Sequence, residues 1–163
     1  ANTRVVRRTE ALLALRQESY GANFTYQEYA FHKSWFSAFK SLVMTGISVL
    51  VLLSPLKKLV KPFLPKPGEG PSETVQENGW FDCKFIVETE DGMKSVFNMN
   101  GKGDPGYKVT SKLVSECALC LVENEESLPG GPGYGGVLTS ASGLGHALIS
   151  RLSKVGINFN GPL

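Results

Sequence analysis

The stretch from Lys94 to Val122 constrains the fold of this chain most strongly, because a strand pattern, a glycine-rich loop and a helix pattern follow one another within it. A short alternating stretch ends at Asn100, and the loop GKGDPGY comes next. Apolar residues then recur at helical spacing. They are Val109, Leu113, Val114, Cys117 and Leu121. This spacing predicts a helix that turns one face toward the core.

The loop contains Gly101-x-Gly103-x-x-Gly106, which is formally the fingerprint of a dinucleotide-binding turn. The preceding stretch alternates like one arm of a hairpin, whereas a dinucleotide fold needs a buried parallel strand there. Pro105 also removes one backbone N–H that could face a phosphate. The three glycines are therefore only weak cofactor-binding candidates, and we expect a structural loop in which they permit positive φ.

A β-hairpin is predicted just upstream of this loop. Residues Trp80–Glu88 alternate, with Cys83, Phe85 and Val87 on one face. Phe81 and Ile86 are expected on or near the other face. The dipeptide Asp91-Gly92 is a strong turn signal, and the stretch Lys94–Asn100 supplies the returning strand.

Helices are predicted near both ends of the chain. Residues 3–19 have an apolar side formed by Val5, Leu12, Leu13 and Leu15. A last helix through Lys154 has an N-cap offered by Ser140-Ala-Ser142 and a final Gly156, and its apolar stripe is Leu144, Leu148, Leu152 and Val155. A short strand, Ile157–Phe159, follows. The predicted class is α+β, with a mixed or antiparallel sheet, packed helices and a separate hydrophobic helical segment.

That hydrophobic segment is the uncharged run Ser41–Pro55, with Lys40 before it and Lys57, Lys58 and Lys61 after it. Fifteen helical residues reach about 22 Å, short of the roughly 30 Å hydrocarbon core of a bilayer. The flanking lysines and aromatics favour a helix that rests on or re-enters a lipid surface. A helix buried against protein and a buried strand are the alternatives. The predicted membrane-contact residues are Trp35, Phe36, Phe39, Leu42, Val43, Val49, Leu50, Leu52, Leu53, Lys57 and Lys58.

The predicted domain organisation follows from these patterns. Residues 1–40 form a helical lead-in, 41–64 the hydrophobic helix, 65–79 a linker rich in proline and glycine, and 80–163 an α+β domain. The chain opens without a methionine or a signal peptide, which predicts a processed chain or a piece of a longer one.

Composition excludes some functions. A net charge of +2, with no basic stripe interleaved with aromatics, argues against nucleic-acid binding. Three cysteines without a framework spacing predict a reducing compartment.

No catalytic or metal-binding set is predicted. Cys117-Ala-Leu-Cys120 lies in mid-helix, where a redox pair would lack the helix N-terminus that lowers a thiol pKa, so we expect core packing. His32 and His146 have no nucleophile beside them. The other polar candidates, which are strand-edge and turn acids and a tyrosine expected to pack across its own turn, are Asp82, Glu88, Glu90, Asp91 and Tyr107.

Several stretches resemble the C-terminal part of the saccharopine dehydrogenase-like oxidoreductases. They are GDPGY (103–107), SECALCL (115–121) and GGVLTSASGLGHALISRLSKVGINF (135–159), preceded in the same order by ANTRVVRRTEALL (1–13) and GPSETVQENGWF (70–81). The resemblance implies an N-terminal Rossmann domain that carries the true fingerprint and binds NAD(P), and this domain is missing from the present chain. It also implies association with lipid droplets and membranes, or with mitochondria.

The leading hypothesis is therefore the C-terminal portion of such an oxidoreductase, providing sheet, dimer or complex contacts and lipid-surface association without a complete active site or a bound cofactor. Its partners would be a membrane or lipid-droplet surface, the missing Rossmann half, and a second copy or a larger complex. The expected location is the reducing side of a lipid droplet, an intracellular membrane or a mitochondrion. A rival hypothesis is a non-enzymatic membrane-docking subunit, and a third is an independent nucleotide binder that uses Gly101–Gly106.

Overall fold

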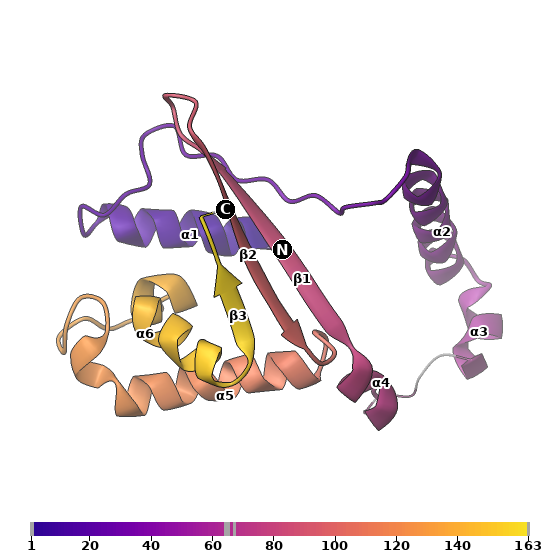
Figure 1. Ribbon diagram of the computed structural model, residues 1–163. Helices are drawn as coiled ribbons and strands as arrows, with labels where there is room; N and C mark the ends of the chain where they lie inside the picture. Colours follow the sequence, from indigo (N-terminus) through magenta and orange to yellow (C-terminus); the bar gives the residue numbers. More distant parts are fainter. Residues whose placement is uncertain (1, 64–65, 67, 163) are drawn as a thin grey trace. The chain divides into compact units, whose positions relative to one another are not determined.

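The computed structural model describes residues 2–63, 66 and 68–162. Its α-helices and strands in chain order are α1 (Asn2–Ala14), α2 (Trp35–Leu53), α3 (Lys57–Val60), α4 (Glu73–Asn78), β1 (Trp80–Glu88), β2 (Lys94–Lys102), α5 (Lys108–Glu123), α6 (Ser140–Lys154) and β3 (Ile157–Asn160) (Figure 1). Two 3₁₀ turns, Lys61–Phe63 and Glu125–Ser127, complete the list. The predicted α+β class is confirmed.

The chain forms two compact units. Unit 1 combines Ala1–Tyr26 with Pro71–Leu163, and unit 2 is the segment Gln27–Gly70 between them. Unit 1 contains the sheet and the hydrophobic core, while unit 2 contains α2 and α3. The expected boundary between residues 64 and 65 lies outside the described residues. Helix α4 occupies part of the stretch expected to be a linker.

The sheet has the order β1-β2-β3, and both pairings are antiparallel. Strands β1 and β2 pair along their full length, from Trp80 opposite Lys102 to Glu88 opposite Lys94, which confirms the predicted hairpin. Strand β3 then pairs with the end of β2, with Ile157 opposite Gly101. Residues two apart in a strand share a face, so Phe81 lies on the same face of β1 as Cys83. The prediction that placed Phe81 on or near the other face is therefore wrong. Its side chain packs against the core.

The core forms where α5 and α6 pack on the sheet beside β3. Its buried apolar residues are Val109, Cys120, Leu144, Leu148, Leu152 and Ile157. The predicted stripe of α6 is confirmed, because Val155 also packs against this cluster. The stripe of α5 is partly wrong: Val114 and Leu121 are more than half exposed, whereas Cys120 is fully buried. The residues of α5 that do lie in or against the core are at positions 109, 113, 117 and 120, and this spacing follows the helical repeat more closely than the predicted stripe.

Polar contacts also join α5 to α6. Arg151 Nε donates to Glu116 Oε2 at 2.8 Å, and Arg151 Nη1 donates to Glu123 Oε2 at 2.7 Å. The Arg151 and Glu116 side chains are largely shielded from solvent. This fork holds the two helices in register beside the apolar contacts.

The N-cap of α6 lies one residue before the stretch Ser140–Ser142 that was predicted to supply it. Thr139 is the N-cap: its Oγ1 accepts from the Ser142 N–H at 3.3 Å, and Ser142 Oγ accepts from the Thr139 N–H at 3.0 Å. The hydroxyl of Ser142 thus fills the role that Glu has in the usual capping box. The end of the helix is as predicted, since Gly156 has φ +85° directly after it.

Helix α6 is broken internally at Gly145, where φ is +49° and ψ is −134°. A Cβ at this position would lie 2.7 Å from Pro129 Cγ. Glycine is therefore required here both by the backbone conformation and by the close approach of the preceding loop.

Helix α1 ends at Ala14, five residues before the expected limit. Val5 and Leu15 of its expected apolar side are exposed, and Thr9 is its buried residue. Arg8 donates to the Val137 carbonyl at 2.5 Å, and Arg16 donates to the Ser142 carbonyl at 3.1 Å. The start of the chain is thus attached to the start of α6.

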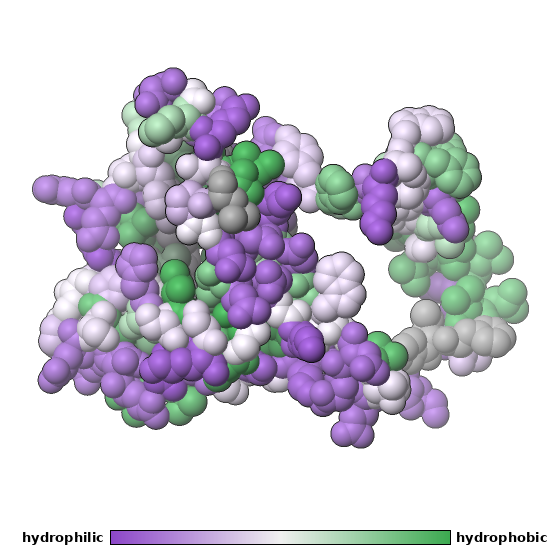
Figure 2. Space-filling model, in the orientation of Figure 1, coloured by the Kyte–Doolittle hydropathy of each residue, from purple (hydrophilic) through white to green (hydrophobic). Residues whose placement is uncertain are grey.

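Helix α2 begins at Trp35, six residues before the hydrophobic run, and ends at Leu53. Ser34 caps it by accepting from the Ser37 N–H at 3.2 Å. Its 19 residues correspond to about 28 Å, more than the 22 Å expected from the run alone. None of its residues is buried. In Figure 2, hydrophobic residues cover much of the visible surface of the segment that Figure 1 labels α2 and α3.

Candidate functional site

The loop between β2 and α5 contains the formal dinucleotide fingerprint. Gly101 lies inside β2, where a Cβ would come within 2.8 Å of the Phe81 ring and 3.0 Å of Ile157. Gly103 has φ +109°, which only glycine adopts readily. Both glycines therefore have a structural role, which supports the prediction of a structural loop.

Most backbone donors of this loop have partners within the protein. The Gly103 N–H donates to the Gly79 carbonyl at 2.7 Å, and the Asp104 N–H donates to the Gln76 carbonyl at 2.8 Å. The Tyr107 N–H donates to the Asp104 carboxylate at 2.8 Å. A phosphate would have to replace these bonds and would meet the negative charge of Asp104.

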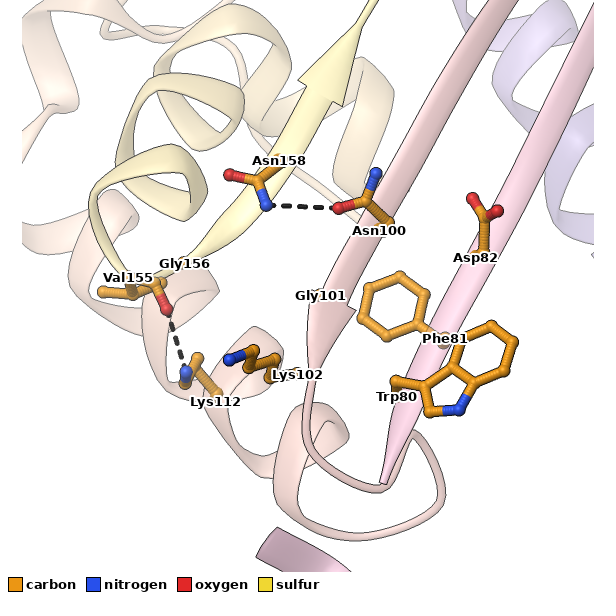
Figure 3. A pocket seen from close by; sticks show the side chains of 10 residues that line it. All are labelled: Trp80, Phe81, Asp82, Asn100, Gly101, Lys102, Lys112, Val155, Gly156 and Asn158. Carbon is orange, nitrogen blue, oxygen red and sulfur yellow. Dashed lines mark hydrogen bonds between the residues drawn. The ribbon is translucent and has the colours of Figure 1, made fainter. Parts of the chain in front are cut away.

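A shallow cleft of about 520 Å³ lies where the two ends of the hairpin meet the start of β3 (Figure 3). The register places Trp80 opposite Lys102, and it places Asn100 opposite both Asp82 and Asn158. Neighbouring residues across antiparallel strands share a face, so these five side chains are grouped by the sheet itself. The remaining wall comes from Phe81, Gly101, Lys112, Val155 and Gly156.

Hydrogen bonds order part of the cleft. Lys112 Nζ donates to the Val155 carbonyl at 2.8 Å, and Asn158 Nδ2 donates to Asn100 Oδ1 at 3.1 Å (Figure 3). The lining residues include two lysines, Lys102 and Lys112, and one carboxylate, that of Asp82, so the wall has an excess of positive charge. Trp80, which the register places opposite Lys102, is 73% exposed and adds an apolar surface to the wall. The cleft is thus suited to bind an anion with an apolar part, but it lacks an acid–base pair for catalysis.

Sequence patterns did not indicate this cleft, because its residues come from β1, β2, α5, β3 and the turn between α6 and β3. The signal that could have found it is the pairing of the hairpin ends with the terminal strand. Lys102 directly precedes Gly103, and Asn158 lies in the short last strand. Only the register of the sheet brings them to one place.

The cysteine pair of α5 belongs to the core. Cys120 is fully buried and Cys117 is half-buried. Burial raises the pKa of the Cys117 thiol, and burial also raises the pKa of the Cys120 thiol against the opposing effect of Arg151. Neither thiol is therefore poised as a thiolate. The third cysteine, Cys83, is exposed on β1.

The other candidates are scattered. His146 is exposed and His32 is half-buried, and they belong to different units. Glu88 pairs with Lys94 at 3.2 Å, and Asn23 donates to Glu90 at 2.7 Å. The Thr89 hydroxyl lowers the pKa of Asp91 within the hairpin turn.

Tyr107 is exposed at the start of α5. Across residues 2–63, 66 and 68–162 there is no group of three His, Cys, Asp or Glu side chains that could hold a metal ion.

The predicted membrane-contact residues all lie on α2 and α3 and are all exposed. Trp35 and Phe39 stack, with ring centroids 5.7 Å apart. Among the described residues, α2 is the one helix that is long and apolar enough to cross a membrane, judged by length and composition alone.

Known proteins with similar sequences are named as reductases. A Mycobacterium tuberculosis H37Rv protein, named provisionally as a trans-acting enoyl reductase, is 36% identical to this chain over 166 residues. The trans-acting enoyl reductases of Mycobacterium bovis BCG and Mycobacterium ulcerans Agy99 are 31% and 30% identical over 164 residues. Each alignment covers 96% of this chain and 38% of the relative, so the chain spans 38% of the length of these curated relatives. No family model matches the chain, and no solved structure matches it.

These relatives overturn the resemblance to saccharopine dehydrogenase-like oxidoreductases and the function inferred from it, because they have the name of a different reductase. The rival assignment to a non-enzymatic docking subunit is set aside for the same reason. The stretches that suggested the resemblance cover most of α1, all of α4, the loop before α5, the second half of α5 and all of α6. Segments of this kind form the fold, and because one fold can serve many functions, similarity in them does not identify the substrate.

The associations with lipid droplets and mitochondria came from the same resemblance, and these mycobacterial relatives do not support them. The broader description as an oxidoreductase agrees with the names of the relatives. Reduction of an enoyl group requires a hydride donor, so these names point to a cofactor of the NAD(P)H type.

Proposed function

We propose that this chain is part of an oxidoreductase that reduces enoyl groups. The observation that carries the proposal is the alignment of 96% of the chain, at 30–36% identity, with proteins named as enoyl reductases. In such a reaction a hydride adds to one carbon of the C=C bond and a proton to the other, and the nicotinamide that supplies the hydride is oxidised.

Within this reaction the cleft beside β3 would bind substrate. Lys102 and Lys112 supply positive charge, and two protons of the Lys112 ammonium remain after its bond to the Val155 carbonyl. Trp80 supplies an apolar wall. An enoyl thioester on a phosphate-bearing carrier combines an apolar acyl chain with anionic groups, and such a ligand suits these walls.

We also propose that the nicotinamide is not bound by Gly101–Gly106 and that this chain by itself binds none. The support is local: the N–H groups of Gly103, Asp104 and Tyr107 are already paired, and Pro105 has none. A reductase that includes this chain would take its cofactor from residues beyond it.

The proposal is tested on the native polypeptide that carries this sequence, isolated from its source. With an enoyl thioester of coenzyme A and NADPH, we expect loss of absorbance at 340 nm together with formation of the saturated thioester. Lys102→Met should raise KM at least about fivefold with little change in kcat, because it removes binding rather than chemistry. Lys94→Met, on the same strand but paired with Glu88, is the matched control and should change neither constant.

Two results would contradict the proposal. Failure of the native polypeptide to reduce any enoyl thioester with either NADH or NADPH would remove the reductase function. Unchanged KM in Lys102→Met, in an enzyme that does reduce the thioester, would remove the role of the cleft alone.

A further inference from the structure

Helix α2 exposes many large apolar side chains. Trp35 is 79% exposed, Leu42 is 71% exposed and Leu50 is 69% exposed. Soluble proteins rarely leave so continuous an apolar surface in water, and such surfaces mark contacts with membranes or proteins. The helix therefore needs a partner.

The polar side chains of α2 are few, and they gather on one side of the helix. Ser37, Ser41, Thr45 and Ser48 recur at spacings of three or four and share one side of the helix. Thr45 Oγ1 donates to the Ser41 carbonyl at 2.9 Å, and Ser48 Oγ donates to the Met44 carbonyl at 2.8 Å. Lys40 lies beside this hydroxyl stripe, and the opposite side consists of Trp35, Phe39, Leu42, Gly46, Leu50 and Leu53. The helix thus has a weakly polar side and a wholly apolar one.

Chain topology excludes a single crossing of a bilayer. Unit 1 contains residues from both before and after unit 2, so the chain leaves unit 1 at Tyr26 and returns to it at Pro71. Both parts are bonded together within unit 1, for example Thr9 with Thr139 at 2.8 Å and Arg16 with the Ser142 carbonyl at 3.1 Å. A single crossing would place these partners on opposite sides of the membrane.

A second crossing that brings the chain back is also excluded. The return would have to use residues after Leu53, which include Lys57, Lys58 and Lys61. Among the described residues after Leu53, α3 and the 3₁₀ turn that follows it cover only Lys57–Phe63, far too few to span the hydrocarbon, and a non-helical crossing would leave backbone groups unpaired there. Lysines within the hydrocarbon would add to the penalty.

Charge indicates which partner covers the apolar side. Residues 29–68 contain six lysines and no aspartate or glutamate. Lys33 and Lys40 lie at one end of α2, and Lys57, Lys58 and Lys61 follow its other end. Lysines at both ends of an apolar helix, with Trp35 and Phe39 stacked at its start, match an anionic lipid surface.

We propose that unit 2 anchors the protein to one leaflet of an anionic membrane. Helix α2 lies in the plane of the interface, with the side of Trp35, Leu42 and Leu50 among the acyl chains and the hydroxyl stripe toward the headgroups. The flanking lysines contact lipid phosphates, and unit 1 stays on the same side of the bilayer. This inference is independent of the proposed reductase function.

The first test compares two matched double variants in flotation with vesicles of phosphatidylcholine and phosphatidylserine (7:3). Wild type should float with the vesicles, and Leu42→Gln/Leu50→Gln should lower its partition coefficient at least about fivefold. Ser41→Gln/Ser48→Gln places the same side chains on the hydroxyl stripe and should stay within about twofold of wild type. Pure phosphatidylcholine, or 0.5 M NaCl, should weaken binding at least about threefold. Equal loss in both variants, or no binding by wild type, would overturn the proposal.

The second test addresses topology. On intact vesicles, a membrane-impermeant amine reagent added outside should label Lys33 and Lys57 alike. Protection of Lys57 until detergent is added would show a crossing and would rule out the in-plane arrangement.

The third test distinguishes lipid from a second copy of the chain. In a Trp80→Phe background, brominated lipid should quench Trp35, and Trp35 emission without lipid should be that of an exposed indole. A dimer in sedimentation, with Trp35 shielded in the absence of lipid, would instead assign the apolar side to protein contact and overturn the lipid proposal.

Discussion

Thr9 of α1 and Thr139, the N-cap of α6, lie with their hydroxyl oxygens 2.8 Å apart, although 130 residues separate them in the chain. Thr9 is 5% exposed, and its hydroxyl also donates to the Val5 carbonyl at 3.0 Å. Since one hydroxyl has a single proton, the bond to Thr139 is then donated by Thr139. This contact links the first helix to the cap of the last one.

Thr9→Val should loosen α1. The substitution keeps the shape of the side chain but removes the hydroxyl, so we expect a loss of about 1 kcal/mol in the free energy of unfolding. Urea denaturation measures the loss, and amide exchange in α1 should accelerate more than in α5. Thr74→Val, on the exposed surface of α4, is the control and should change stability by less than about 0.5 kcal/mol. Equal effects of the two substitutions would exclude a role for the Thr9–Thr139 contact.

Gly145→Ala should destabilise unit 1. The change forces a side chain into φ +49° and into the Pro129 ring, with an expected loss of about 2 kcal/mol or more. Gly131→Ala is the matched control: φ is +75°, but no atom lies within 4 Å of the new Cβ. Pro129→Ala should recover part of the loss at position 145, which a double-mutant cycle would measure. Additive effects of the two substitutions would show that the loop does not oppose the side chain.

The three cysteines should differ in reactivity. At pH 7.5, iodoacetamide should modify exposed Cys83 at least about tenfold faster than Cys117 or Cys120, because burial raises the pKa of both α5 thiols. Peptide mass spectrometry gives the rates, and all three should react alike in 8 M urea. Fast modification of Cys120 in the folded chain would contradict its place in the core.

Raised thiol pKa values also predict how stability depends on pH. The raised pKa favours the neutral thiol in the folded state, so its stabilisation is complete below the unfolded pKa, about 8.5, and is lost as pH rises through the folded pKa. The free energy of unfolding should therefore fall with pH above this value. Cys120→Ala should reduce the slope of the free energy of unfolding against pH. An unchanged slope would assign the pH dependence to other titrating groups.

Titration with NADH or NADPH should give no saturable change in the fluorescence of Trp35 and Trp80 when this chain is used alone. A phosphate is disfavoured in the loop for two reasons. The N–H groups of Gly103, Asp104 and Tyr107 already have partners, and the Asp104 carboxylate would repel the negative charge. Gly103→Val is the companion variant. A micromolar isotherm in wild type that this substitution abolishes, without unfolding the chain, would establish the loop as a nucleotide site.

Local sequence patterns determined the hairpin, the apolar stripe of α6 and the end of that helix. Alternation in Trp80–Glu88 and the Asp91-Gly92 turn set the pairing of β1 with β2, because the period of a strand and the geometry of a turn depend on neighbouring residues. The stripe Leu144, Leu148 and Leu152 and the terminal Gly156 identified α6 for the same reason. The apolar run of α2 is likewise visible in the sequence alone.

Tertiary structure decided which side of each element is covered and which residues form a site. Leu121 is apolar but exposed, whereas Cys120 beside it is buried, because α6 and β3 contact one side of α5 only. Phe81 packs on the core because the register places Gly101 opposite it and Ile157 opposite Gly101. The cleft likewise required the register that brings Asn158 opposite Asn100. The contact of Thr9 with Thr139 likewise joins distant residues. Local propensity specifies periodicity, but the choice among faces depends on burial against segments distant in sequence, and the folded chain alone supplies those segments.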